Sequence, residues 1–264
     1  MKKIAFCFLI YDTIIHEELW NIFFDSVDTN KYSIYIHYKT NKPLKYFEKH
    51  KLTNCIETKY ADKTLSLAQN ILFREAYKDA DNYKFQMVSG SCVPLKSFNF
   101  IYDKLIADDY GYLNVSPQSQ CFPNCDCLLN VIELKNIAKS HQWLILNRKL
   151  VENLCFDKDE YLNEHYRTIY APEEYFYYTL IKILELEDEI ITTPNVANGA
   201  TTFTNWADMD YKYPSLNGLK NYSSIEAEEL NYLLNGQSLY GRKFDASCAS
   251  SLFNKKYIDY ISSK

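Results

Sequence analysis

The chain has 264 residues, a hydrophobic content of 47%, 6 glycines, 7 prolines and a net charge of −5. This length and composition favour one compact domain with short connections and exclude a linker-rich or disordered chain. The acidic balance, with a pI near 5.6 and no long basic run, argues against nucleic acid or an anionic membrane as the main partner.

The N-terminal sequence and the cysteines predict a cytoplasmic protein without a transmembrane segment. The opening Met-Lys-Lys leads directly into an apolar run that is too short for a membrane span and has no signal-peptide cleavage site. The eight cysteines are therefore expected to be reduced thiols. Their one cluster, Cys121, Cys125 and Cys127, has poor zinc spacing, so we expect a mobile, oxidisable loop there and no metal site.

Two rounds of alternating strand and helix patterns are predicted in the first third of the chain. The first round has the order of a βαβ unit, and its near-continuous apolar runs are typical of strands covered on both faces. In chain order the predicted elements are a strand at Ile4–Ile10, a helix at His16–Phe24, a strand at Tyr32–Tyr38, a helix at Pro43–His50, a strand at Cys55–Tyr60 and a helix at Leu65–Tyr77.

The stretch Tyr83–Leu95 is the first candidate for a ligand site. The apolar run Phe85–Val88 has no helical spacing and ends abruptly at Ser89-Gly90-Ser91, which predicts a buried strand that runs into a tight loop. An ordinary strand-to-helix turn is the alternative. The functional interpretation is that a ligand approaches this bare backbone, because open α/β sheets bind ligands outside the carboxyl ends of their strands.

The rest of the chain continues the alternation and then becomes less regular, so we predict a single α/β domain over residues 1–264. The remaining predicted elements are helices at Ser97–Ile106, Leu128–Ser140, Arg148–Cys155 and Pro172–Leu186, one more from Glu226, strands at Tyr110–Val115, Trp143–Leu146, Glu189–Val196 and Thr201–Trp206, and a polar loop at Ser116–Asp126.

Two adjacent glutamates, Glu173 and Glu174, follow Pro172 at a predicted helix start. Proline suits the first helical position and carboxylates in the first turn are favoured by the helix dipole, so a purely structural role explains both. The functional alternative is that one of them points into a cleft as a general base.

A second patch is basic and consists of Lys220, Arg242 and Lys243. Such residues commonly form a solvated surface. If the fold brings them together, they would instead neutralise a phosphate leaving group.

Two short Asp-X-Asp patterns, Asp79–Asp81 and Asp208–Asp210, match the motif that holds a divalent metal in many sugar transferases. Neither follows the strand after which such a motif belongs. That position is taken by Ser89-Gly90-Ser91, so the sequence predicts no metal site there.

Taken together and in order, five segments resemble the core-2/I-branching β-1,6-N-acetylglucosaminyltransferases and their plant-type relatives. The similarity extends from the first strand to about Phe244. The segments are Met87–Leu95, Gln142–Arg148, Ala171–Phe176, Phe203–Trp206 and Gly241–Phe244.

This resemblance implies a GT-A type glycosyltransferase fold, a UDP-sugar donor, a glycan acceptor, inversion at the anomeric carbon and catalysis without a metal or other cofactor. It also implies a nucleotide-sugar-binding half at residues 1–115 and an acceptor-binding, catalytic half at residues 116–264. By the family pattern Glu174 is the general base, and Lys220 and Lys243, assisted by Arg242, bind the donor diphosphate.

The same resemblance places the other candidate residues. Trp206 and Glu173 match acceptor-binding positions, and Glu173 stands where aspartate is usual. Ser89, Gly90 and Ser91 fall at the donor nucleotide and sugar, and His37 matches a histidine beside the nucleotide pocket, with a role in the core as its alternative.

Two features depart from the family or stay open. Animal members are membrane-anchored and have structural disulfides, whereas this chain begins at the first strand. N-acetylglucosamine is the donor sugar that the resemblance favours, with xylose as the alternative. A glycan-binding protein without catalysis also stays open, while a two-carboxylate hydrolase ranks lowest because adjacent helical glutamates diverge by about 100°.

Overall fold

The structure is a computed structural model that describes residues 1–194 and 201–263. Its strands are β1 (Lys3–Ile10), β2 (Tyr32–Tyr38), β3 (Asn82–Ser89), β4 (Val93–Pro94), β5 (Gly111–Ser116), β6 (Lys139–Ser140), β7 (Ile145–Asn147), β8 (Ile190–Pro194), β9 (Thr202–Thr204) and β10 (Tyr240–Arg242). Within these residues seven strands form a central mixed sheet in the order β2-β1-β3-β7-β5-β6, with β8 paired to β5. The other three form a smaller sheet in the order β4-β10-β9.

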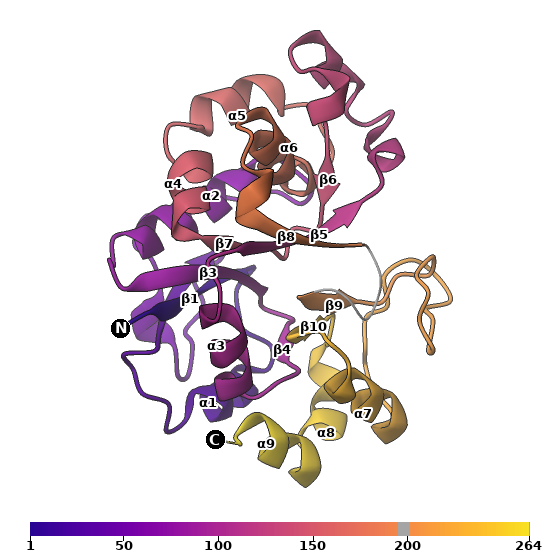
Figure 1. The fold of residues 1–264 in the computed structure, drawn as a ribbon. Coiled ribbons are helices and arrows are strands. Elements are labelled where there is room, and N and C mark those ends of the chain that lie inside the picture. The colour runs from indigo at the N-terminus through magenta and orange to yellow at the C-terminus, as the bar shows by residue number, and fades with distance from the viewer. Residues whose placement is uncertain (195–200, 264) are drawn as a thin grey trace.

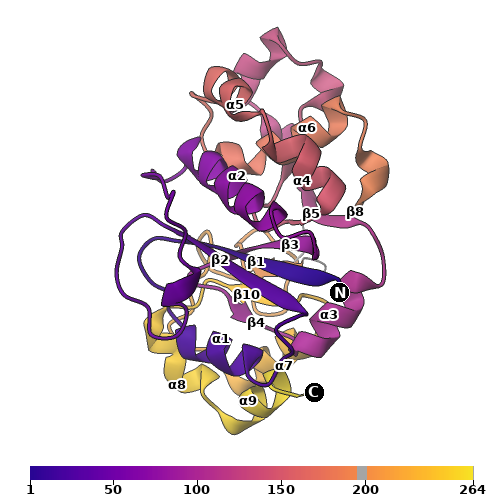
Figure 2. The ribbon, with the colours of Figure 1, turned by 90° about the vertical axis from the view of Figure 1, so that its left-hand side faces the viewer.

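Helices cover both faces of the central sheet, so the predicted α/β class is confirmed (Figures 1 and 2). On one face lie α2 (Thr64–Tyr77), α4 (Arg148–Cys155), α5 (Asp159–His165) and α6 (Phe176–Ile183). On the other face lie α1 (Glu17–Phe24) and α3 (Phe98–Ile106). The C-terminal helices α7 (Ala227–Asn235), α8 (Ala249–Leu252) and α9 (Lys255–Ile261) pack against the smaller sheet and α1.

Strand β1 shows why the sequence folds into these layers. Ala5 and Cys7 belong to the core shared with α2, α4 and α6, while Phe6 and Phe8 belong to the core shared with α1 and α3. Because successive side chains of a strand point to opposite faces, a strand covered on both sides must be apolar throughout. β1 pairs in parallel with β2 and with β3, which confirms the predicted βαβ unit.

The helix predicted at Pro43–His50 is wrong, because only a 3₁₀ turn forms at Glu48–His50. The carboxylate of Glu17, at the start of α1, accepts hydrogen bonds from the backbone N–H groups of Lys45, Tyr46 and Phe47 at 2.7–3.0 Å. A residue distant in sequence thus satisfies the backbone donors of this segment without any helical hydrogen bond.

The strand predicted at Cys55–Tyr60 does not form either. The N–H of Ile56 donates to His37 Nε2 at 3.0 Å and the N–H of Lys59 to Thr64 Oγ1 at 2.9 Å. Side chains therefore accept hydrogen bonds that a neighbouring strand would have accepted.

The segment from Ser116 to Ser140 also differs from the prediction. In place of a polar loop and a long helix it forms 3₁₀ turns at Gln118–Cys121, Asp126–Asn130 and Leu134–Asn136. Cys121 and Cys125 are buried in the core, and Cys127 is exposed. The prediction expected an oxidisable loop, whereas two of its three thiols pack in the core as small hydrophobes.

Three further findings concern the described residues. All eight cysteines are free thiols. Among the described side chains no group of three or more His, Cys, Asp and Glu is arranged to hold a metal ion. No helix in this part of the chain has the length and apolarity that a bilayer crossing requires.

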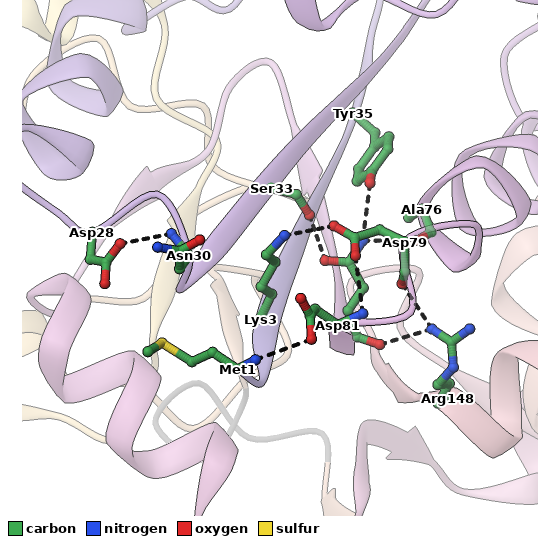
Figure 3. Close-up of polar contacts among 11 residues, drawn as sticks. Met1, Lys3, Asp28, Asn30, Ser33, Tyr35, Ala76, Asp79, Asp81 and Arg148 are labelled. Atoms are coloured by element: carbon green, nitrogen blue, oxygen red, sulfur yellow. Dashed lines mark hydrogen bonds and ion pairs between the residues drawn. The ribbon is translucent and has the colours of Figure 1, made fainter.

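Arg148 joins the end of α2 to the start of β3, as Figure 3 shows in part. Its guanidinium donates to the backbone carbonyls of Tyr77, Asp79 and Asn82 at 2.8–3.1 Å and lies 3.9 Å from the Tyr77 ring centroid. The carboxylate of Asp79, from the first Asp-X-Asp pattern, accepts from Lys3 Nζ at 2.9 Å (Figure 3). This pattern therefore has a structural role at the amino end of the sheet.

We expect Arg148→Lys to lower the free energy of unfolding by about 2–4 kcal/mol, because one ammonium cannot replace a planar fork that serves three carbonyls. Urea denaturation followed by circular dichroism measures the change. Lys149→Ala is the control, since its exposed pair with Glu189 is expected to contribute less than about 1 kcal/mol. Equal effects of the two substitutions would contradict this role of Arg148.

Candidate active site

A cleft of about 850 Å³ lies at the carboxyl edge of the parallel strands β1, β2 and β3. The end of each strand and the residues that follow it line the cleft: Leu9–Thr13 at the end of β1, Lys39 after β2 and Ser89–Ser91 at the end of β3. Parallel pairing brings these three ends to one edge, the position at which open α/β sheets bind ligands. The predicted loop Ser89-Gly90-Ser91 therefore does line a cleft.

Position 90 has room only for a glycine, because another loop of the chain lies against its backbone. A Cβ atom built on it would lie 2.5 Å from the carbonyl oxygen of Thr13, closer than real side chains come to backbone. The N–H of Ile15 donates to the Gly90 carbonyl at 2.8 Å, which keeps the two loops together. The missing side chain thus allows the loop after β3 to meet the loop after β1.

The smaller sheet brings distant residues to the same cleft. β10 pairs in parallel with β9 and antiparallel with β4, which directly follows the Ser89–Ser91 loop (Figure 1). The N–H of Phe244 donates to the Ser91 carbonyl at 3.1 Å. Trp206, which is 38% exposed, then lines the cleft after β9, and Arg242 and Lys243 line it at the end of β10.

Glu173 and Glu174 lie in a short turn and not in a long helix. A 3₁₀ turn spans Pro172–Glu174, α6 begins only at Phe176, and Ala171 before the turn has a left-handed φ of 51°. The predicted helix Pro172–Leu186 is therefore interrupted at its start. Both glutamates line the cleft.

Glu174 is ion-paired within the cleft. Its Oε2 lies 3.3 Å from Nζ of Lys139, which is itself part of the cleft wall. Lys139 was not among the predicted site residues, because the segment that contains it was predicted to be one helix. Its place three residues before the Gln142–Arg148 segment was the one signal that pointed to it.

Glu173, unlike Glu174, is buried and has no ion pair among the described residues. Its residue surface is only 6% exposed and its Oε2 has no hydrogen-bond partner among the described residues. Burial raises the pKa of Glu173 to about 8, and the neighbouring Glu174 adds to the shift. At neutral pH this shift favours the protonated form of Glu173, which is able to donate a hydrogen bond.

Arg242 and Lys243 place two adjacent cations in the same cleft as these carboxyl groups. Burial lowers the pKa of Arg242, while the nearby Cys92 and Glu174 oppose the shift. Burial also lowers the pKa of Lys243, and the charge of Arg242 lowers it further. Within the described residues neither cation has a salt bridge to a carboxylate, so an anionic ligand would relieve both costs.

Arg242 is oriented by an aromatic contact. Its guanidinium lies 4.2 Å from the ring centroid of Trp143, another cleft residue, and its Nε has no hydrogen-bond partner in the described part of the chain. Cation–π contact with a partly desolvated ring holds the charge in place without neutralising it.

Two predicted site residues do not line the cleft. Lys220 points its Nζ to Glu229 Oε2 at 3.3 Å and lies over the Tyr222 ring. His37 is fully buried, and its Nε2 accepts from the N–H of Ile56. The structure thus supports the core alternative for His37. Of the second Asp-X-Asp pattern, only Asp208 lines the cleft.

Comparisons with known proteins show what the chain is similar to. A family model described as Core-2/I-Branching enzyme matches residues 4–233. The protein Glycosyltransferase BC10 of Oryza sativa subsp. japonica is 24% identical over 164 residues, which are 60% of this chain and 41% of the rice protein. The match thus spans about two-fifths of the length of this relative.

Two solved structures of the galactosyltransferase LgtC are similar at 7% sequence identity. The complex with donor and acceptor sugar analogues has a TM-score of 0.48 and covers 98% of this chain and 96% of that chain. An active-site mutant has the same TM-score and covers 90% of this chain and 86% of that chain.

The buried Glu173 makes stability depend on pH. Its pKa is about 4.5 when unfolded and about 8 when folded, so its contribution is fully present below 4.5 and is lost as the pH rises through 8. We expect the melting temperature to fall more between pH 5.5 and pH 9 in the wild type than in Glu173→Gln, whose side chain stays neutral. Thermal denaturation at both pH values tests this, and parallel curves for the two proteins would show that Glu173 is ionised when folded.

Proposed function

The chain belongs to the Core-2/I-branching enzyme family, and we propose from this membership and from the cleft that it is an inverting glycosyltransferase. The proposed donor is a UDP-sugar, with N-acetylglucosamine favoured over xylose by the family resemblance. The proposed acceptor is a hydroxyl group of a glycan, and the reaction needs no metal ion.

The observation that carries this proposal is the pair Arg242 and Lys243 beside Glu174 in one cleft. Two half-buried cations without carboxylate partners in the described chain are suited to a diphosphate, and an ionised carboxylate nearby is suited to proton abstraction. The loop Ser89-Gly90-Ser91 takes the place at which metal-dependent transferases carry their Asp-X-Asp carboxylates.

In the proposed reaction Glu174 takes the proton from the acceptor hydroxyl. That oxygen attacks the anomeric carbon from the face opposite UDP, the bond from this carbon to the UDP oxygen breaks, and the configuration inverts. Arg242 and Lys243 stabilise the charge that develops on the departing diphosphate, as preorganised cations do in other reactions with a phosphate leaving group. No covalent enzyme intermediate forms.

Other cleft residues have supporting roles in this proposal. Lys139 holds the Glu174 carboxylate in place through their ion pair. Glu173, as a neutral acid, donates a hydrogen bond to the acceptor, and Trp206 offers the acceptor an aromatic face. Lys220 would reach the diphosphate only after leaving Glu229, so it ranks behind Arg242 and Lys243.

The proposal is tested by incubating the purified protein with a panel of UDP-sugars and simple glycans, with and without EDTA. Turnover of one donor that resists EDTA supports a metal-free transferase, and the anomeric configuration of the product, read by NMR, tests inversion. UDP binding without any turnover would favour a glycan-binding protein, and absence of UDP binding would refute the donor assignment.

In this assay we expect Glu174→Gln to lower kcat by about two to four orders of magnitude, the usual contribution of a positioned base. Glu173→Gln is the matched control, because its amide imitates the neutral acid and should keep kcat within about tenfold. Near-normal turnover by Glu174→Gln, or equal losses in both variants, would exclude Glu174 as the base.

We expect Lys243→Ala to weaken UDP binding by roughly tenfold or more, the loss of one charge-assisted contact to the diphosphate. Titration calorimetry with UDP in the presence of EDTA measures the affinity. Lys256→Ala, at an exposed position outside the cleft, is the control and should bind UDP as the wild type does. Unchanged affinity in Lys243→Ala would remove its diphosphate role.

A further inference from the structure

Two tyrosines at the mouth of the cleft have no role in the reaction described above. Tyr60 is 86% exposed and Tyr170 is 60% exposed, and both line the cleft. Their ring centroids lie 6.3 Å apart, with the ring planes at 73°, and their hydroxyl oxygens are 3.5 Å apart. Single exposed aromatic residues are common, but two that meet at a cleft mouth form an amphipathic surface.

The backbone beneath these rings is tightly held. The N–H of Ala171 donates to the carbonyl of Ala61 at 3.0 Å, which ties the segment after Tyr60 to the segment after Tyr170. Both alanines have left-handed φ values, 53° for Ala61 and 51° for Ala171. L-residues with a side chain rarely adopt this conformation, and it persists where the surrounding structure imposes it, often at functional sites.

Side chains anchor each segment from outside. Asn124 brackets Tyr170, since its amide donates to the Tyr170 carbonyl at 2.8 Å and its oxygen accepts from the Tyr170 N–H at 3.1 Å. On the other segment Thr64 accepts from the N–H of Lys59, directly before Tyr60. The two rings are therefore displayed to solvent from a fixed backbone.

The location of the pair relates it to the acceptor. Tyr170 precedes the turn that carries Glu173 and Glu174, and both of these carboxyl groups are close enough to Tyr170 to act on it electrostatically. The cations Arg242 and Lys243, which we assign to the donor, come from the smaller sheet. A sugar chain whose hydroxyl meets Glu174 would lie in the same cleft as the Tyr60 and Tyr170 rings.

We propose that Tyr60 and Tyr170 form a second acceptor subsite, which binds the sugar ring next to the one that receives the new sugar. A pyranose ring has an apolar C–H face and a polar rim, and an exposed tyrosine offers a matching apolar ring and a polar hydroxyl. The acceptor is accordingly an oligosaccharide and not a free monosaccharide. This inference rests on the proposed transferase function and specifies its substrate.

Saturation-transfer NMR in the presence of saturating UDP tests the proposal. The probes are the disaccharides N,N′-diacetylchitobiose, lactose and cellobiose, each compared with N-acetylglucosamine, galactose or glucose. In the wild type we expect at least one disaccharide to bind more tightly than its monosaccharide. The variants Tyr60→Ala and Tyr170→Ala should each weaken disaccharide binding by about two- to tenfold and leave monosaccharide and UDP binding unchanged.

Controls distinguish failure of the proposed subsite from failure of the proposed transferase function. Tyr110→Ala, an exposed tyrosine outside the cleft, should keep the preference for the disaccharide, and melting temperatures verify that each variant is folded. A preference that survives in both cleft variants, or no disaccharide preference in the wild type while UDP binds, would overturn the subsite and leave the donor assignment intact. Failure of the wild type to bind UDP would instead refute the proposed function.

Discussion

The close approach of two loops at Gly90 is the constraint on which the site depends. The loop after β1 passes the loop after β3 at a distance that leaves no room for a Cβ atom. Two carbonyls of the same turn accept further hydrogen bonds. The Ser91 carbonyl accepts from the N–H of Phe244, and the Cys92 carbonyl accepts from the indole N–H of Trp20. A single turn thus connects the central sheet, α1 and the smaller sheet, and thereby places the cations of β10 next to the strand ends.

Burial disfavours the charged form of both the acidic and the basic groups of the cleft, with different consequences. It makes Glu173 a neutral acid beside the paired Glu174, so two adjacent residues of one type have different chemistry. It also destabilises the charges of Arg242 and Lys243, a cost that a bound anion would offset. Because these costs reduce the stability of the free protein, the arrangement is better explained by ligand binding than by folding.

Elements with strong periodicity were predictable from the sequence, and elements set by distant partners were not. β1, β2, α2 and α4 follow the predictions closely, because their apolar patterns match the faces that they bury. The segments 43–60 and 128–140 were predicted incorrectly. In the first of them the side chains of Glu17, His37 and Thr64 accept hydrogen bonds from backbone N–H groups. No local sequence pattern reveals such partners.

The sequence by itself determined the α/β class, the loop at Ser89-Gly90-Ser91 and the candidate glutamates, since these depend on local composition and spacing. Only the tertiary structure decided which candidates share a cleft. It brought Arg242, Lys243 and Trp206 to the strand ends, turned Lys220 to Glu229 and added Lys139 and the tyrosine pair. The physical reason is that burial, ion pairing and pKa depend on neighbours in space, which a single chain of residue types does not specify.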